Sequence, residues 1–176
     1  MSMTINGSGT ITGLSAGGLP DGSIQQADLA ANVAGNGPAF SAYYGTGSTA
    51  ISNNTLTKVP FTSKDFDTNN YFDATTNYRF TPLVAGYYQI NTLVYQGGAT
   101  GETVNSIYKN GSPWKIINDN NITSANTYRL LGGSALVYLN GSTDYIEIYT
   151  LINGASPVIN SGQLNCWVQG FLARSA

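Results

Sequence analysis

The sequence predicts an all-β protein, an antiparallel β-sandwich that follows an extended N-terminal arm. From Pro38 onward, apolar and polar residues alternate with a period of two, and β-branched and aromatic residues are frequent. Turn dipeptides interrupt this pattern about every 8 to 15 residues, as in antiparallel sandwiches. Charged residues make up only 9% of the 176 residues, while tyrosine contributes 12, so we expect a surface that is polar but mostly uncharged.

The arm, residues 1–37, is rich in glycine and contains no aromatic residue. Its apolar residues recur at spacings that fit neither a strand nor a long helix, which favours an extended anchor lying on a partner surface: Ile5, Ile11, Leu14, Leu19, Ile24 and Leu29. Ser23 followed by Gln26 matches a capping box, which predicts one short helix that runs to about Val33 and is closed by Gly35. The alternative is a disordered tail.

The head, residues 38–176, is predicted to consist of strands with almost no helix. We expect them near residues 39–44, 55–61, 78–81, 87–96, 103–109, 113–119, 127–139, 145–151 and 163–172. Asn-Gly dipeptides, which supply the positive φ of tight turns, are predicted to end strands at Asn110-Gly111, Asn140-Gly141 and Asn153-Gly154.

Residues 86–95 predict a strand that is partly apolar on both faces. One face would carry Tyr88, Ile90 and Val94, and the other Tyr87, Leu93 and Tyr95. Such a strand belongs inside an assembly rather than at a wet surface. We therefore expect an obligate oligomer, in which a carboxylate in place of Tyr88 would be buried without a partner and would disrupt the assembly.

Composition excludes several classes of protein. The formal net charge is −2 and the sequence has no basic stripe, so nucleic acid is not an expected partner. No apolar run approaches the roughly 20 residues of a membrane-spanning helix, so no membrane association is expected. Residues 1–13 lack the features of a Sec signal peptide, which predicts that the protein is not exported by that route. One cysteine, Cys166, permits no internal disulfide, so packing or oligomerisation must supply stability.

Catalysis is not expected. The chain has no histidine, which removes the usual general base and the Ser-His and Cys-His nucleophile pairs. Carboxylate chemistry would need two carboxyl groups in one cleft, and the chain has only two glutamates, Glu102 and Glu147, beside its aspartates. The alternating strand around Glu147 predicts that this side chain points outward or contacts another subunit. We assign Cys166 to core packing.

The block from Phe61 to Tyr88 resembles the signature of the complement C1q and tumour-necrosis-factor (TNF) superfamily, through Phe61, Asp67, Phe72, Phe80, Gly86 and Tyr88. The closing segment is similar to the last strand of that family, through Trp167, Gly170 and Phe171. The resemblance implies a ten-stranded jelly roll that assembles as a homotrimer. It also implies that these nine residues build the core and the trimer contacts.

The segment "TINGSGTITGLSAGGLPDGSIQQADLAANV" resembles segments that precede such heads in structural proteins of bacteriophages, notably cyanophages and other marine phages. This resemblance implies a protein on the surface of a virion, assembled in the cytoplasm of a bacterial host. The implied partners are further copies of this chain and the phage major capsid protein or another virion protein.

Asp65, Asp67 and Asp73 lie close together in a segment with the oxygen-rich composition of a calcium loop. An EF-hand is excluded, because Asn70 and Thr76 stand where that loop needs glycine and glutamate. We expect a solvated loop without metal here, and no cofactor. Heads of the resembling superfamily sometimes hold calcium near the trimer axis, so the resemblance implies a calcium site as the alternative.

Two roles fit these expectations. A capsid decoration or cement protein would lay its arm across neighbouring coat subunits, whereas a short tail-fibre or tip protein would bind glycan on the host surface. The short arm before the head favours decoration. Tyrosines can stack on sugars, but most are expected to fill the sandwich and the trimer interface. A secreted C1q-like lectin is disfavoured, because the Sec signal is missing.

Overall fold

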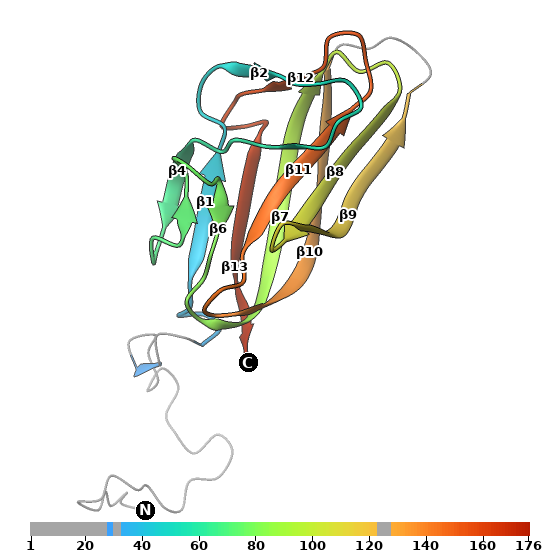
Figure 1. Cartoon of the computed structure of the whole chain (residues 1–176). Coiled ribbons are helices and arrows are strands. Elements are labelled where there is room, and N and C mark those ends of the chain that lie inside the picture. The colour runs from blue at the N-terminus through green and yellow to red at the C-terminus, as the bar shows by residue number, and fades with distance from the viewer. Residues whose placement is uncertain (1–27, 30–32, 123–127) are drawn as a thin grey trace, which may run out of the picture. The chain divides into compact units, whose positions relative to one another are not determined.

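The computed structural model describes residues 28–29, 33–122 and 128–176. It confirms the all-β jelly-roll prediction, because two antiparallel sheets face each other across one core (Figure 1). The strands are β1 (Ala39–Tyr43), β2 (Ser48–Ala50), β3 (Thr57–Lys58), β4 (Ser63–Asp67), β5 (Phe72–Asp73), β6 (Arg79–Phe80), β7 (Ala85–Gly97), β8 (Glu102–Lys109), β9 (Ser112–Asn121), β10 (Tyr128–Asn140), β11 (Ile146–Ile152), β12 (Val158–Asn160) and β13 (Trp167–Ser175). Within these ranges no helix is long and apolar enough to cross a membrane.

The first sheet runs β4-β1-β13-β7-β10, with β12 and β2 continuing beside the end of β7. The second runs β5-β6-β11-β8-β9, with β3 beside β11. The first and last strands of the head, β1 and β13, are hydrogen-bonded neighbours. Several pairs of neighbouring strands, such as β1 with β13 and β7 with β13, are thus distant in sequence, as in Greek-key and jelly-roll folds.

The long strands and the short strands β3 and β6 were predicted, whereas β2, β4, β5 and β12 were missed. Strand β4 has the sequence SKDFD, which shows no apolar alternation because it lies at a sheet edge with most side chains exposed. Strands β2, β5 and β12 are too short to show any period. The predicted strand 163–172 begins only at Trp167, because the N–H groups of Asn165 and Cys166 both donate to the carbonyl of Gly162 in a turn.

The core lies between the sheets. On β7 the even-numbered side chains Tyr88, Ile90 and Val94 point into it. Phenylalanines fill one end, where the Phe40 and Phe80 rings stack with centroids 4.2 Å apart. The other end contains a buried polar group, in which the Gln96 amide donates to the Thr150 hydroxyl and that hydroxyl donates to the Val104 carbonyl.

Two of the three predicted Asn-Gly turns have the expected backbone. Asn110 and Gly111 connect β8 to β9 with φ of 53° and 76°, and Gly141 follows β10 with φ of 70°. The prediction for Gly154 was wrong, since its φ is not in the left-handed region. The segment after β11 crosses to β12 in the other sheet instead of forming a hairpin, and a Cβ on Gly154 would lie 1.9 Å from the Gly98 carbonyl oxygen.

The head includes a few residues before Pro38. The chain divides into two units, residues 1–30 and 31–176, and the second of them is the head. In the second unit the Asn36 N–H donates to the Val33 carbonyl, and Gly35 adopts a φ of 89°. Of the predicted arm contacts, Leu29 is described and exposed, while Ile5, Ile11, Leu14, Leu19 and Ile24 lie outside the described residues. Most of the predicted helix, residues 23–33, also lies outside them.

Candidate self-association face

The outward side of the β4-β1-β13-β7-β10 sheet carries a broad set of exposed apolar side chains. We name it the association face, and its large apolar members, each 40–59% exposed, are Phe66, Tyr87, Tyr128, Leu130, Leu136, Tyr138 and Phe171. They come from the edge strand β4, from the neighbouring strands β7 and β10, and from β13. An exposed apolar surface of this extent on a folded domain marks an interaction site.

Strand alternation places these residues on one side. Since the even-numbered residues of β7 and the odd-numbered residues Val137 and Leu139 of β10 fill the core, their sequence neighbours point outward. The pairing register then aligns Leu136, Gln89 and Phe171 in one row across three strands.

Aromatic pairs lie near the two ends of the face. Tyr87 pairs with Tyr138 with ring centroids 5.4 Å apart, and Tyr95 approaches Tyr128 at 5.5 Å. Between them the register pairs uncharged polar residues, Asn91 with Ser134 and with Gln169.

The face has a groove that a second protein surface can fill. Phe66 and Phe171 flank a cavity of about 230 Å³, floored in part by Gly170. A side chain at Gly170 would meet the core residues Ile90 and Phe40 at under 3 Å, so only the backbone of this residue lines the groove. A shallow, apolar, uncharged groove suits protein packing better than catalysis.

Most residues of the sequence signature build the sandwich itself. Phe61, Phe72, Phe80 and Tyr88 are all buried in the core. Gly86 and Gly170 allow close strand packing, since a Cβ on Gly86 would lie 2.5 Å from Leu172. Phe171 belongs to the association face, and the partly exposed Trp167 lies on the same outward side of the sheet.

The expectation that a charge at Tyr88 would disrupt assembly needs correction. The Tyr88 ring is fully buried, its hydroxyl donates to the Val84 carbonyl at 2.8 Å, and burial raises the pKa of that hydroxyl. We expect an aspartate there to unfold the head, whereas the neighbouring odd-numbered side chains of β7 lie on the association face.

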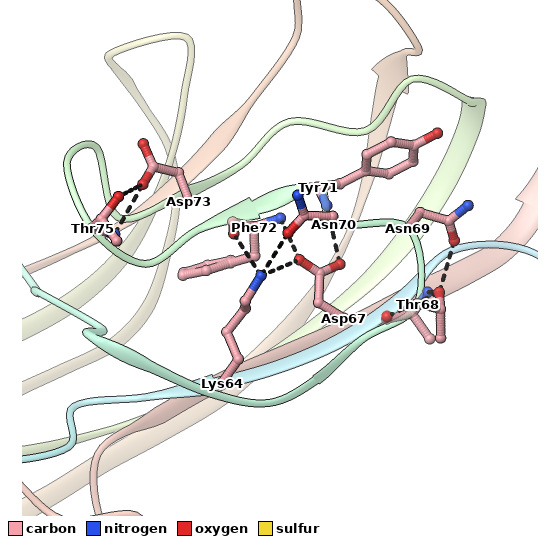
Figure 2. A network of polar contacts seen from close by, with 10 residues as sticks. Lys64, Asp67, Thr68, Asn69, Asn70, Tyr71, Phe72, Asp73 and Thr75 are labelled. Atoms are coloured by element: carbon pink, nitrogen blue, oxygen red, sulfur yellow. Dashed lines mark hydrogen bonds and ion pairs between the residues drawn. The ribbon is translucent and has the colours of Figure 1, made fainter.

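The three aspartates proposed for calcium do not form one site. Asp65 accepts hydrogen bonds from Ser41 and Gln163, Asp67 from Lys64 and two backbone N–H groups, and Asp73 from its own turn. Figure 2 shows Asp67 and Asp73 with these separate partners. Across the described parts of the chain, no three acidic, histidine or cysteine side chains are placed to hold a metal. These donors therefore do not fit a shared calcium ion, and calcium binding by this chain stays a prediction.

Asp73 instead stabilises the turn between β5 and β6. Its carboxylate accepts the backbone N–H groups of Thr76 and Thr75 at 3.0 and 2.9 Å, and that of Asn77 at 3.0 Å. The two threonine N–H bonds are the main cause that holds the Asp73 pKa well below its ordinary value, against the opposing effect of burial.

This geometry predicts a pH-dependent contribution to stability. Because the folded-state pKa of Asp73 is depressed, the stabilisation is complete above the unfolded pKa of about 4 and is lost as the pH falls toward the folded pKa. We expect Asp73→Asn to lower the free energy of unfolding by about 1 to 2 kcal/mol near neutral pH, and by less at about pH 3. Urea unfolding curves at both pH values measure it, with Asp119→Asn on β9 as control. A deficit that is equal at both pH values would contradict the assignment.

Two further groups that the sequence analysis considered, Glu147 and Cys166, are buried in the fold. Glu147 alternates with the core residues Ile146 and Ile148 and therefore points away from the core, as predicted, but it is only 5% exposed because its carboxylate lies 2.6 Å from the Lys58 ammonium. The cause is β3, which pairs with β11 and brings Lys58 beside it. Cys166 is buried as predicted, and burial raises the pKa of its thiol to about 11.

Comparison with known proteins shows the fold. No family model matches the chain, and no curated protein matches it in sequence. Murine APRIL at pH 8.5 superposes with a TM-score of 0.56 at 11% identity, over 77% of this chain and 98% of that one. The Eiger TNF of S. frugiperda superposes at 0.60 and 9% identity, over 78% and 93%. The PRD1 vertex protein P5 superposes at 0.55 and 17% identity, over 78% and 97%. The chain thus has the jelly-roll fold of these TNF-type structures.

Proposed function

We propose that this chain is a non-enzymatic structural protein of a phage particle, that it forms a homotrimer through the association face, and that it decorates the capsid. The observation that carries the proposal is the uncharged, aromatic outward side of the β4-β1-β13-β7-β10 sheet, centred on Leu136 and Phe171. Burying these side chains against another copy would remove the large exposed apolar surface from water.

In a ring of three identical subunits each subunit contacts the next one head to tail. Such a contact joins two different surfaces of the chain, and these two surfaces must fit each other. The second apolar surface of the head lies on β9, where Trp114 is 45% exposed and Ile116 is 64% exposed. Strand β9 ends the second sheet, at the side where β10 ends the first. Packing this edge of one subunit on the association face of the next uses both surfaces and supports a closed trimer.

The virion assignment is supported by two similarities. Residues 4–33 resemble segments that precede such heads in phage structural proteins, and the fold is shared with a phage vertex protein, P5 of PRD1. The word vertex in that protein's name favours a place on the capsid for this chain also. A short tail-fibre or tip protein is the second candidate, and it is favoured by a polar groove on the side of the head, described below.

The test has two measurements. Analytical ultracentrifugation of the purified protein should give the mass of a trimer. Quantitative mass spectrometry of purified particles should give hundreds of copies per particle for decoration, whereas a copy number matching a few tail appendages would transfer the protein to the tail. A monomer at all concentrations, or absence from the particles, would contradict the proposal.

A further inference from the structure

A polar groove lies on the side of the head, formed by residues of β4, β5 and β6, the turns between them and the segment after β6. Its volume is about 530 Å³, and its lining includes Lys64, Asn70, Tyr71, Asn77, Arg79 and Leu83. None of the residues named as the association face lines it. Every residue that lines the groove in this structure belongs to one chain.

The first wall is the turn between β4 and β5, which is held rigid by its own side chains (Figure 2). The Lys64 ammonium donates to the Asp67 carboxylate at 3.0 Å and to the Asn70 side-chain oxygen at 2.9 Å. Asp67 in turn accepts the backbone N–H groups of Tyr71 and Phe72. Because Asn70 uses its oxygen here, its amide N–H₂ group remains to serve a ligand.

The second wall is the turn between β5 and β6, which Asp73 holds through the bonds described above. It contains Tyr78, whose φ of 50° is in the left-handed region, an outlier for an aromatic residue. Asn70 in the first wall has a φ of 56°. Such conformations persist only where the surroundings impose them, and they concentrate at ligand-binding sites. Two rigid walls lower the entropy cost of binding.

The groove offers a cation without an anionic partner. Arg79 lies on β6 directly across from Asp73, but the Asp73 oxygens are used by the turn. The Arg79 guanidinium instead lies over the Tyr145 ring, 4.3 Å from its centroid. Among the residues that the structure describes, no carboxylate approaches Arg79 within ion-pair distance. Its fork of N–H donors is suited to bind a carboxylate with two bonds.

We propose that this groove binds an acidic saccharide, with the sugar carboxylate on Arg79. The Asn70 amide and the Asn77 side-chain oxygen provide donors and acceptors for the ring hydroxyls. The Tyr71 ring and Leu83, which is 61% exposed, provide apolar contact for the C–H face of the pyranose. This activity goes beyond the structural role proposed above and does not depend on it, because one chain contains every residue involved.

The test titrates the full-length protein with D-galacturonate and follows binding by ligand-observed NMR and calorimetry. D-galactose and acetate are the comparison ligands, since they present the ring and the carboxylate separately. We expect saturable binding of galacturonate in the millimolar range, and weaker binding of either comparison ligand. Arg79→Gln should weaken galacturonate binding about tenfold or more, and Arg79→Lys should retain part of it.

Two further variants complete the test. Leu83→Asp changes an exposed residue, so the fold should persist while the added carboxylate repels the ligand and weakens binding by a similar factor. Lys115→Gln on β9 removes a cation at the opposite edge of the second sheet and should leave binding unchanged. Absence of saturable binding, equal binding by Arg79→Gln and the parent protein, or equal affinity for acetate would each overturn the proposal. Arg79→Gln should not change the sedimentation mass. A failure of saccharide binding can therefore be distinguished from a failure of trimer formation.

Discussion

Replacing Leu136 by aspartate is expected to convert the proposed trimer into folded monomers. Leu136 is 51% exposed on β10 and lies in the row with Gln89 and Phe171, at the middle of the association face. In a trimer each copy would bury an unpaired carboxylate, at a cost of several kcal/mol per ion. Association should weaken by at least about a hundredfold. Sedimentation equilibrium and circular dichroism measure mass and fold.

Leu56→Asp is the matched control for this substitution. Leu56 is also a leucine, 42% exposed, but it precedes β3 beside the second sheet, away from the association face. It should sediment as the parent protein does. If Leu136→Asp remains a trimer, the subunits do not use this sheet to associate. If it unfolds, Leu136 contributes to the core despite its exposure, and Phe171→Asp then repeats the test on β13.

The association face could be anticipated because a strand that is apolar on both faces has apolar residues at both its odd and its even positions. In residues 86–95 one set of alternating side chains fills the core. The other set includes Tyr87 and Tyr95, which are larger and more apolar than the side chains usual on a solvent-exposed sheet face. This pattern predicted that one of the two sets would contact a partner outside the sandwich. The structure assigns the even positions to the core, and the sequence alone could not distinguish the two sets.

The polar sites could not be read from the sequence, because their partners are distant in the chain. The spacing of Asp65, Asp67 and Asp73 suggested a shared ion, yet a bulge in the β1–β4 pairing lies at Asp65, and Lys64 and the following turns satisfy the other two carboxylates. Glu147 meets Lys58, 89 residues earlier, only because a two-residue strand pairs with β11. Strand β4 carries no periodic signal, and the predicted strand 55–61 gave no indication that Lys58 would pair with Glu147.

Removing residues 1–30 is expected to abolish incorporation into particles while leaving the head folded and trimeric. Every residue of the main core cluster lies between Phe40 and Leu172, and so does every named residue of the association face. Residues 33–37 belong to the compact head, so the cut is placed before Ala31 rather than at Pro38. Circular dichroism and sedimentation check fold and mass, and mass spectrometry of purified particles measures occupancy.

The reason to expect a large loss is that three arms act together. Ordering a glycine-rich segment costs about 1 to 2 kcal/mol of backbone entropy per residue, so each arm alone should bind weakly. A trimer ties three arms to one body, which raises their effective concentration and converts weak contacts into stable attachment. Full-length protein with serine at Ile5, Ile11, Leu14 and Leu19 keeps the length of the arm and should lose occupancy as the truncation does. If the truncated head instead enters particles at the parent occupancy, the anchor lies in the jelly roll.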